Sequence, residues 1–138
     1  PTHPLSPWAT YTLNSQETNG NSLVMRLSYG QVRFLFTGDL TWYGERELIA
    51  VFGDKGLDAD IVEWAHHGNR DTGTLEFFEA VTPDLILYRN PKIVTPLSYH
   101  TSTVSTLGDR KGASVGIRGT GTGELTISTD GLTYSVSE

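Results

Sequence analysis

The sequence contains no cysteine. This absence excludes a disulfide scaffold, thiolate metal ligands and a cysteine nucleophile, and it leaves the redox compartment open. Any metal ion must therefore be bound by histidine, aspartate or glutamate side chains. Basic residues are also few, with 10 Lys and Arg against 16 Asp and Glu and a formal net charge of −6. This charge argues against a broad basic surface for nonspecific binding of nucleic acid, although it does not exclude nucleic acid.

Long apolar runs are missing as well, so the sequence predicts no membrane span. The 138 residues are enough for one domain with a modest core. Fifteen glycines, together with many serines and threonines, predict short strands and frequent turns rather than a helical bundle. The chain begins with Pro1 rather than Met, which favours a processed or excised segment of a longer chain. None of these features indicates a compartment.

The first part of the chain predicts an irregular lead-in followed by a β-hairpin. Residues 1–20 hold three of the six prolines and a polar run, so we expect no regular element there. Apolar and polar residues then alternate over 22–29, and a second, more apolar run covers 32–37. Gly30 and Gln31 between them predict a tight turn.

The remainder alternates between helical and strand patterns. Helices are predicted over 45–52, ending at Gly53, and over 74–81, ending before Pro83. Residues 89–100 are expected to form a loop, with a weakly signalled short helix after it over 102–107. Strands are predicted over 61–65, 85–88, 114–118, 124–128 and 132–136. This order predicts one α/β domain over 21–138, with a mixed sheet and flanking helices.

Two motifs follow apolar strands, where open α/β sheets place their ligands. The first is Gly38-Asp39, for which a simple turn or a helix N-cap is the alternative interpretation. The second is His66-His67-Gly68, for which the alternative is one buried histidine beside an exposed one. Adjacent side chains on a strand point to opposite faces, so only one histidine of the pair is expected to bind a metal ion directly. The other is expected to orient it or to contact substrate.

Together the two motifs resemble the metallo-β-lactamase superfamily. The most similar branch contains the ComEC/Rec2-type competence hydrolase domain and related phosphodiesterases and phosphorylcholine esterases. The resemblance covers roughly residues 20–138. The segments that carry it are 21–24, 34–39, 59–68, 77–84, Tyr99-His100 and 123–131.

The resemblance implies a metal site. In the family, the carboxylate of the Gly-Asp motif bridges two metal ions, which assigns that role to Asp39. A histidine of the His-His-Gly turn completes the coordination, here His66 or His67, with His66 favoured. The implied cofactor is a pair of Zn²⁺ or Mn²⁺ ions that activate a water molecule. His100 matches a histidine that follows a tyrosine in this branch and could face the leaving group or a phosphate; a surface-loop histidine is the alternative.

Two departures from the family pattern matter. The main His-x-His-x-Asp-His signature is absent, and His3 is the only histidine before Asp39. Because that signature lies in the N-terminal half of the αββα sandwich, we expect this chain to be the C-terminal half, within a longer protein or as a truncated relative. The small Ser or Thr that usually follows His-His-Gly is Asn69 here. Arg70 behind it could pair with a phosphate or carboxylate of the substrate, or with Asp71.

The leading hypothesis is a metal-dependent hydrolase, with phosphodiesterase activity favoured by the branch resemblance. Its missing ligands would come from the N-terminal half of the same protein or from a second chain. The substrate would be a small anionic or ester-type molecule, contacted by His67, Asn69 and Arg70. The rival hypothesis is a non-catalytic interaction module that retains the half-fold. A β-rich carbohydrate-binding module is disfavoured by the βαβ pattern over 31–88.

Overall fold

The centre of the protein is a five-stranded sheet with the order β1-β2-β3-β4-β5. The computed structural model describes residues 18–89, 97–112, 114–119 and 124–137, so most of the expected lead-in lies outside the described residues. β1 pairs antiparallel with β2, and the other neighbours are parallel. The predicted mixed α/β sheet is thus confirmed. The strands are β1 (Met25–Tyr29), β2 (Val32–Phe36), β3 (Ile61–Glu63), β4 (Leu85–Tyr88) and β5 (Gly116–Gly119).

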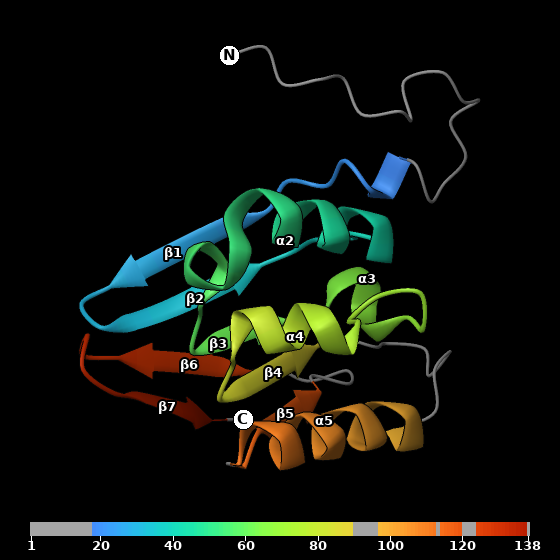
Figure 1. Cartoon of the computed structure of the whole chain (residues 1–138). Coiled ribbons are helices and arrows are strands. Elements are labelled where there is room, and N and C mark those ends of the chain that lie inside the picture. The colour runs from blue at the N-terminus through green and yellow to red at the C-terminus, as the bar shows by residue number, and fades with distance from the viewer. Residues whose placement is uncertain (1–17, 90–96, 113, 120–123, 138) are drawn as a thin grey trace, which may run out of the picture.

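Three helices cover one face of this sheet, and they lie side by side in Figure 1. They are α2 (Trp42–Leu57), α4 (Leu75–Val81) and α5 (Leu97–Lys111). The main core lies between the two layers, where strand residues such as Val62 and Ile86 pack with Trp64, Phe78 and Leu107. These side chains are almost completely buried, so apolar burial holds the helices on the sheet.

Two helix predictions were wrong in extent. α2 begins earlier than expected and continues to Leu57, although Gly53 leaves the helical conformation with φ 59° and ψ −170°. Gly53 therefore ends the first helical segment, as expected, and a second segment follows it across a kink that its positive φ allows. α5 replaces the end of the expected loop and the short predicted helix with fifteen helical residues. Its polar composition hides it in the sequence, because among its described side chains only those of His100, Val104 and Leu107 are buried.

The opposite face of the sheet is partly covered by a second hairpin. Strands β6 (Thr126–Thr129) and β7 (Tyr134–Ser137) form a separate two-stranded antiparallel sheet, as the Asp130-Gly131 turn predicts. Ile127, Tyr134 and Val136 pack against a smaller core of Val32, Ile61 and Leu85. The tip of this hairpin meets the turn between β1 and β2, where the Gln31 amide donates to the Gly131 carbonyl at 2.6 Å. Figure 1 shows the two turns meeting.

The hairpin leaves the β1 side of that face uncovered. Every residue of β1 is exposed, and Leu27 keeps half of its surface accessible. On the neighbouring strand β2, Phe34 lies opposite Leu27 and Phe36 lies opposite Met25, so these apolar side chains are adjacent. We call this set the β1 apolar face; it comprises Met25, Leu27, Tyr29 and Phe36. Among the described helices, none is long and apolar enough to cross a bilayer.

Candidate functional site

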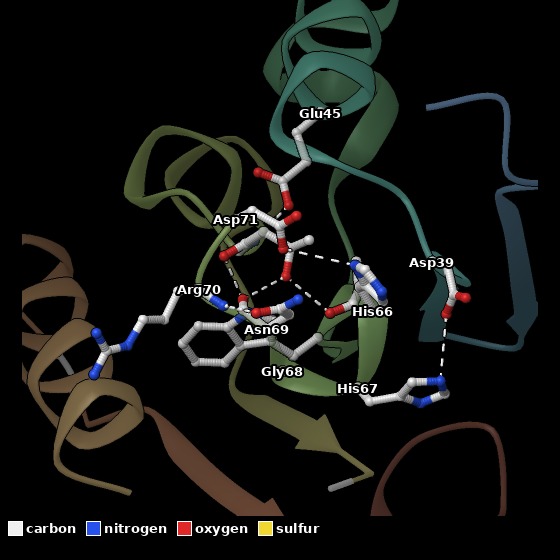
Figure 2. A network of polar contacts seen from close by, with 12 residues as sticks. Asp39, Glu45, His66, His67, Gly68, Asn69, Arg70 and Asp71 are labelled. Atoms are coloured by element: carbon white, nitrogen blue, oxygen red, sulfur yellow. Dashed lines mark hydrogen bonds and ion pairs between the residues drawn. The ribbon is translucent and has the colours of Figure 1, made fainter. Parts of the chain in front are cut away.

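The two motifs singled out in the sequence meet at one edge of the sheet. β2 and β3 are parallel neighbours, so the segments that follow them leave the sheet together. The His66 amide donates to the Gly38 carbonyl at 2.8 Å, which joins the two turns directly. The Asp39 Oδ1 atom then lies 3.5 Å from His67 Nε2 (Figure 2). This carboxylate and this imidazole are far apart in sequence, yet they are close enough to share one metal ion.

The His-His-Gly turn does not continue the strand. Its residues form a short left-handed turn, α3 (Ala65–Gly68), in which His66 has φ 51° and His67 has φ 58°. Side chains in such a turn do not alternate between faces, so the sequence argument for a single inward histidine was wrong in its premise. Positive φ is unfavourable for non-glycine residues, and such strain persists only where the surroundings enforce it.

His100 is one of the residues that enforce this turn. Its side chain is 1% exposed and packs between the rings of Trp64 and Tyr88. Its Nε2 atom lies 2.7 Å from the Gly68 carbonyl, which can only accept, so Nε2 is the donor. The alternative of a surface-loop histidine was therefore wrong, because His100 belongs to α5. Its ring supports the turn through this contact with Gly68.

Gly68 is required by this packing. Its φ is +79°, and a Cβ atom on it would lie 2.8 Å from His100 Nε2. A side chain at this position would thus clash with the histidine that holds the turn. The glycine of the motif therefore has a structural role.

The loop after the turn is held by hydrogen bonds to its own backbone and to Trp64. The Thr72 hydroxyl, which has one proton to donate, lies 2.8 Å from the carbonyl oxygens of both Ala65 and Asn69. The Trp64 indole N–H donates to the Thr72 carbonyl at 3.2 Å. The Asn69 side chain accepts from the Arg70 amide at 2.7 Å, so its carboxamide oxygen has a local structural partner. The loop is consequently a well-defined structure rather than a free surface segment.

Glu45, on α2, supplies the strongest link to this loop. It is completely buried and accepts hydrogen bonds from the Gly73 amide at 2.5 Å, the Thr74 amide at 2.9 Å and the Thr74 hydroxyl at 2.7 Å. Burial raises its pKa, and the hydrogen bonds from Thr74 and Gly73 oppose this effect. Nothing in the sequence patterns had singled out Glu45. The feature that could have identified it is its spacing, because Glu45 lies three residues before Leu48 and so on the side of the helix that packs against the core.

Asp71 faces His66 within the same loop. Its Oδ1 atom lies 3.6 Å from His66 Nδ1, and Figure 2 shows the two side chains pointing toward each other. Both atoms are buried and have no hydrogen-bond partner in the described part of the chain. The Asp71 backbone carbonyl accepts from the Trp42 amide at 3.1 Å, which ties the loop to the first turn of α2.

Arg70, in the same loop, contacts Tyr99 of α5. Its guanidinium lies over the Tyr99 ring, 5.7 Å from the centroid, and the Tyr99 hydroxyl donates to the Arg70 carbonyl at 3.2 Å. Burial raises the pKa of Tyr99. The anticipated pairing of Arg70 with Asp71 is replaced by this ring contact. The exposed guanidinium remains available to an anionic group from solution.

The donor atoms fit part of a metal site. Asp39 and His67 have the right chemistry for Zn²⁺ or Mn²⁺, and their side chains are 44% and 58% exposed, so a metal ion could reach them. In the described ranges, however, no group of three His, Cys, Asp or Glu side chains could hold a metal ion. Zinc sites use three or more protein ligands. The residues therefore provide part of a site, and a full site requires ligands from elsewhere.

The fold and this edge of the sheet define an α/β domain with a carboxylate–imidazole pair beside its central strands. Comparison with known proteins adds two partial similarities. The chain is 33% identical over 81 residues to ComE operon protein 3 of Bacillus subtilis (strain 168), covering 59% of this chain and 10% of that protein. It is 34% identical over 68 residues to competence protein ComA of Neisseria gonorrhoeae, covering 49% of this chain and 10% of that protein.

The chain thus spans about a tenth of the length of these two curated relatives. No family model matches it, and no solved structure matches it. The similarity to competence proteins agrees with the competence-type branch identified from the motifs. The metallo-β-lactamase assignment itself stays a prediction.

Proposed function

We propose that this chain is the C-terminal half of a metallo-β-lactamase-type αββα sandwich and supplies part of the metal site of a hydrolase. The observation that carries the proposal is the convergence of Asp39 and His67, 3.5 Å apart, from turns after two parallel strands. The partial similarity to two competence proteins supports the choice of branch. The substrate class favoured by that branch is a phosphodiester.

Each residue has a defined part in this proposal. Asp39 and His67 hold the exposed donor atoms, and His66 is the neighbouring imidazole whose backbone is bonded to Gly38. When bound, the metal ions would polarise the scissile bond and lower the pKa of a water molecule. Arg70, on the adjacent loop, would bind an anionic group of the substrate. His100 would support the turn from within the core and is too buried to contact a leaving group.

The missing ligands would come from the N-terminal half of the same protein or from a second chain. Such a partner would also explain the β1 apolar face, because a second sheet packed there would remove Leu27 and Phe36 from water. The sequence departure that motivates this part of the proposal is the absence of the His-x-His-x-Asp-His signature.

Titration of the 138-residue chain with Zn²⁺, followed by residue-resolved NMR, tests the proposal. We expect weak binding, with dissociation constants above about 1 μM, because a site that lacks the usual three or more protein ligands holds zinc poorly. The perturbed signals should be those of Asp39, His66 and His67, and the double change Asp39→Asn and His67→Ala should abolish them. Asp84→Asn, which removes one carboxylate from the pair with Lys111, is the charge-matched control and should change nothing.

Two outcomes would contradict the proposal. Zinc binding tighter than about 1 μM would mean that the chain holds a complete site of its own. Perturbations that avoid all three residues would mean that this edge of the sheet is not a metal site.

A non-catalytic interaction module is the second candidate, and the β1 apolar face is the observation that favours it. Amino-acid substitutions can distinguish these two candidate functions. A pure interaction module should keep its partner when Asp39 and His67 are replaced, and lose it on Leu27→Lys. A hydrolase completed by its other half should lose activity by orders of magnitude on Asp39→Asn.

A further inference from the structure

His66 and Asp71 form a buried contact that the proposed metal site does not by itself require. His66 Nδ1 and Asp71 Oδ1 face each other at 3.6 Å, and neither atom has another hydrogen-bond partner among the residues described. That distance is longer than a hydrogen bond. Leaving both atoms unpaired away from water is unfavourable, which favours a closer approach of the two side chains in solution.

The chemistry of this contact decides which ring nitrogen of His66 carries the proton. A carboxylate oxygen only accepts, so it favours the tautomer in which Nδ1 is protonated. The lone pair is then left on Nε2. A neutral imidazole binds a metal ion through such a lone pair, and the partner of the other nitrogen fixes the tautomer.

The position of Asp71 is fixed by two hydrogen bonds, one at Asp71 itself and one at Gly73. Its carbonyl accepts from the Trp42 amide at 3.1 Å, and two residues later the Gly73 amide donates to Glu45 at 2.5 Å. Both contacts come from α2, the helix that directly follows Asp39 and Leu40. α2 therefore places the Asp71 carboxylate against the turn that holds His66.

We propose that Asp71 is a positioning residue for His66, holding its ring in the Nδ1–H tautomer with Nε2 free to bind a metal ion. This inference rests on the proposed function, in which His66 belongs to the metal site. It assigns distinct roles to the two histidines of the turn. His67 faces Asp39 directly, and His66 is oriented from behind by Asp71 (Figure 2).

Nitrogen-15 NMR of the metal-free chain tests the tautomer without any activity measurement. The ring nitrogens are recorded at increasing pH until their signals stop changing, so that the neutral form is observed. His66 should show a protonated Nδ1, and a His66→Gln variant assigns its signals. Asp71→Ala and the similarly sized Asp71→Leu, neither of which has an acceptor atom, should both shift His66 toward the Nε2–H form. Asp109→Asn, on the exposed side of α5, is the control that removes a carboxylate elsewhere.

Zinc titration of the same variants gives the second readout. Loss of the partner of a histidine ligand typically lowers metal affinity about 10- to 100-fold, and this is the change expected for Asp71→Leu. A wild-type His66 in the Nε2–H form would overturn the inference even if no variant folds. So would a tautomer that is unchanged in Asp71→Leu.

The two proposals fail in different ways. If Zn²⁺ perturbs His66 but its tautomer is independent of Asp71, the metal site stands and the inference is wrong. If the tautomer depends on Asp71 but Zn²⁺ perturbs neither Asp39 nor the two histidines, the proposed function is wrong, and with it the assignment of His66 to a metal site.

Discussion

Replacement of Glu45 by alanine should destabilise the protein far more than an ordinary surface change. The variant would leave the amides of Gly73 and Thr74 without their carboxylate acceptor, and the Thr74 hydroxyl would lose a bond of 2.7 Å. Each buried donor left unsatisfied costs about 1–3 kcal/mol. Relief of the buried carboxylate offsets part of this cost. We therefore expect the free energy of unfolding to fall by about 2–4 kcal/mol, a large part of the roughly 5–15 kcal/mol of a typical domain.

The effect should depend on pH in a defined direction. Burial raises the pKa of Glu45 above its ordinary value of 4.5, so the folded protein binds this proton more tightly than the unfolded chain. The stabilisation from protonation is complete below about pH 4.5 and is lost as pH rises through the folded-state pKa. Wild type should therefore exceed the alanine variant by more near pH 4 than near pH 7.

Urea unfolding at these two pH values, followed by tryptophan fluorescence, measures both quantities. Glu47→Ala is the matched control, since Glu47 is an exposed glutamate in the same helix and its loss should change stability by less than about 0.5 kcal/mol. An alanine variant at position 45 that is as stable as this control would refute the role given to Glu45. A difference that grows as pH rises would refute the sign.

Two further predictions concern the turn and the exposed face. Gly68→Ala should cost more than about 2 kcal/mol, because it combines an unfavourable positive φ with a clash against His100. Gly112→Ala is the control, because Gly112 has φ +68° and a Cβ atom added there would have no neighbour within 4 Å. It should cost only the conformational part, about 1 kcal/mol. Equal losses of stability for the two variants in urea unfolding would contradict the clash with His100. Leu27→Lys should leave the free energy of unfolding within about 0.5 kcal/mol of wild type, because Leu27 is half exposed. It should also reduce any self-association through this apolar face that sedimentation velocity detects. A large loss of stability would instead place Leu27 in the core.

The local patterns of the sequence were sufficient for most of the fold. Alternating residues gave the β1–β2 hairpin, and the helical spacing over 74–81 gave α4, whose N-cap Thr74 accepts from the Phe77 amide. These predictions succeed because strand and helix periods repeat within a few residues. The same reasoning failed for α5, since a helix with a narrow apolar stripe has too weak a period to be recognised.

Only part of the candidate site could be predicted from local sequence patterns. The Gly-Asp and His-His-Gly motifs were visible, and the structure brings the two motifs together, although Asp39 lies beside His67 and not beside the favoured His66. Glu45 and Asp71 were not singled out, because an acidic residue looks the same in a sequence whether it is solvated or buried.

What only the tertiary structure decided is the conformation of the turn and the partners around it. The sequence alone placed the two histidines on a strand, yet the fold holds both at positive φ. The contacts that do so join residues about thirty positions apart, such as His100 to Gly68 and Glu45 to Gly73. Local propensity acts over a few residues, whereas burial and hydrogen bonding at this distance exist only once the sheet has brought the segments together.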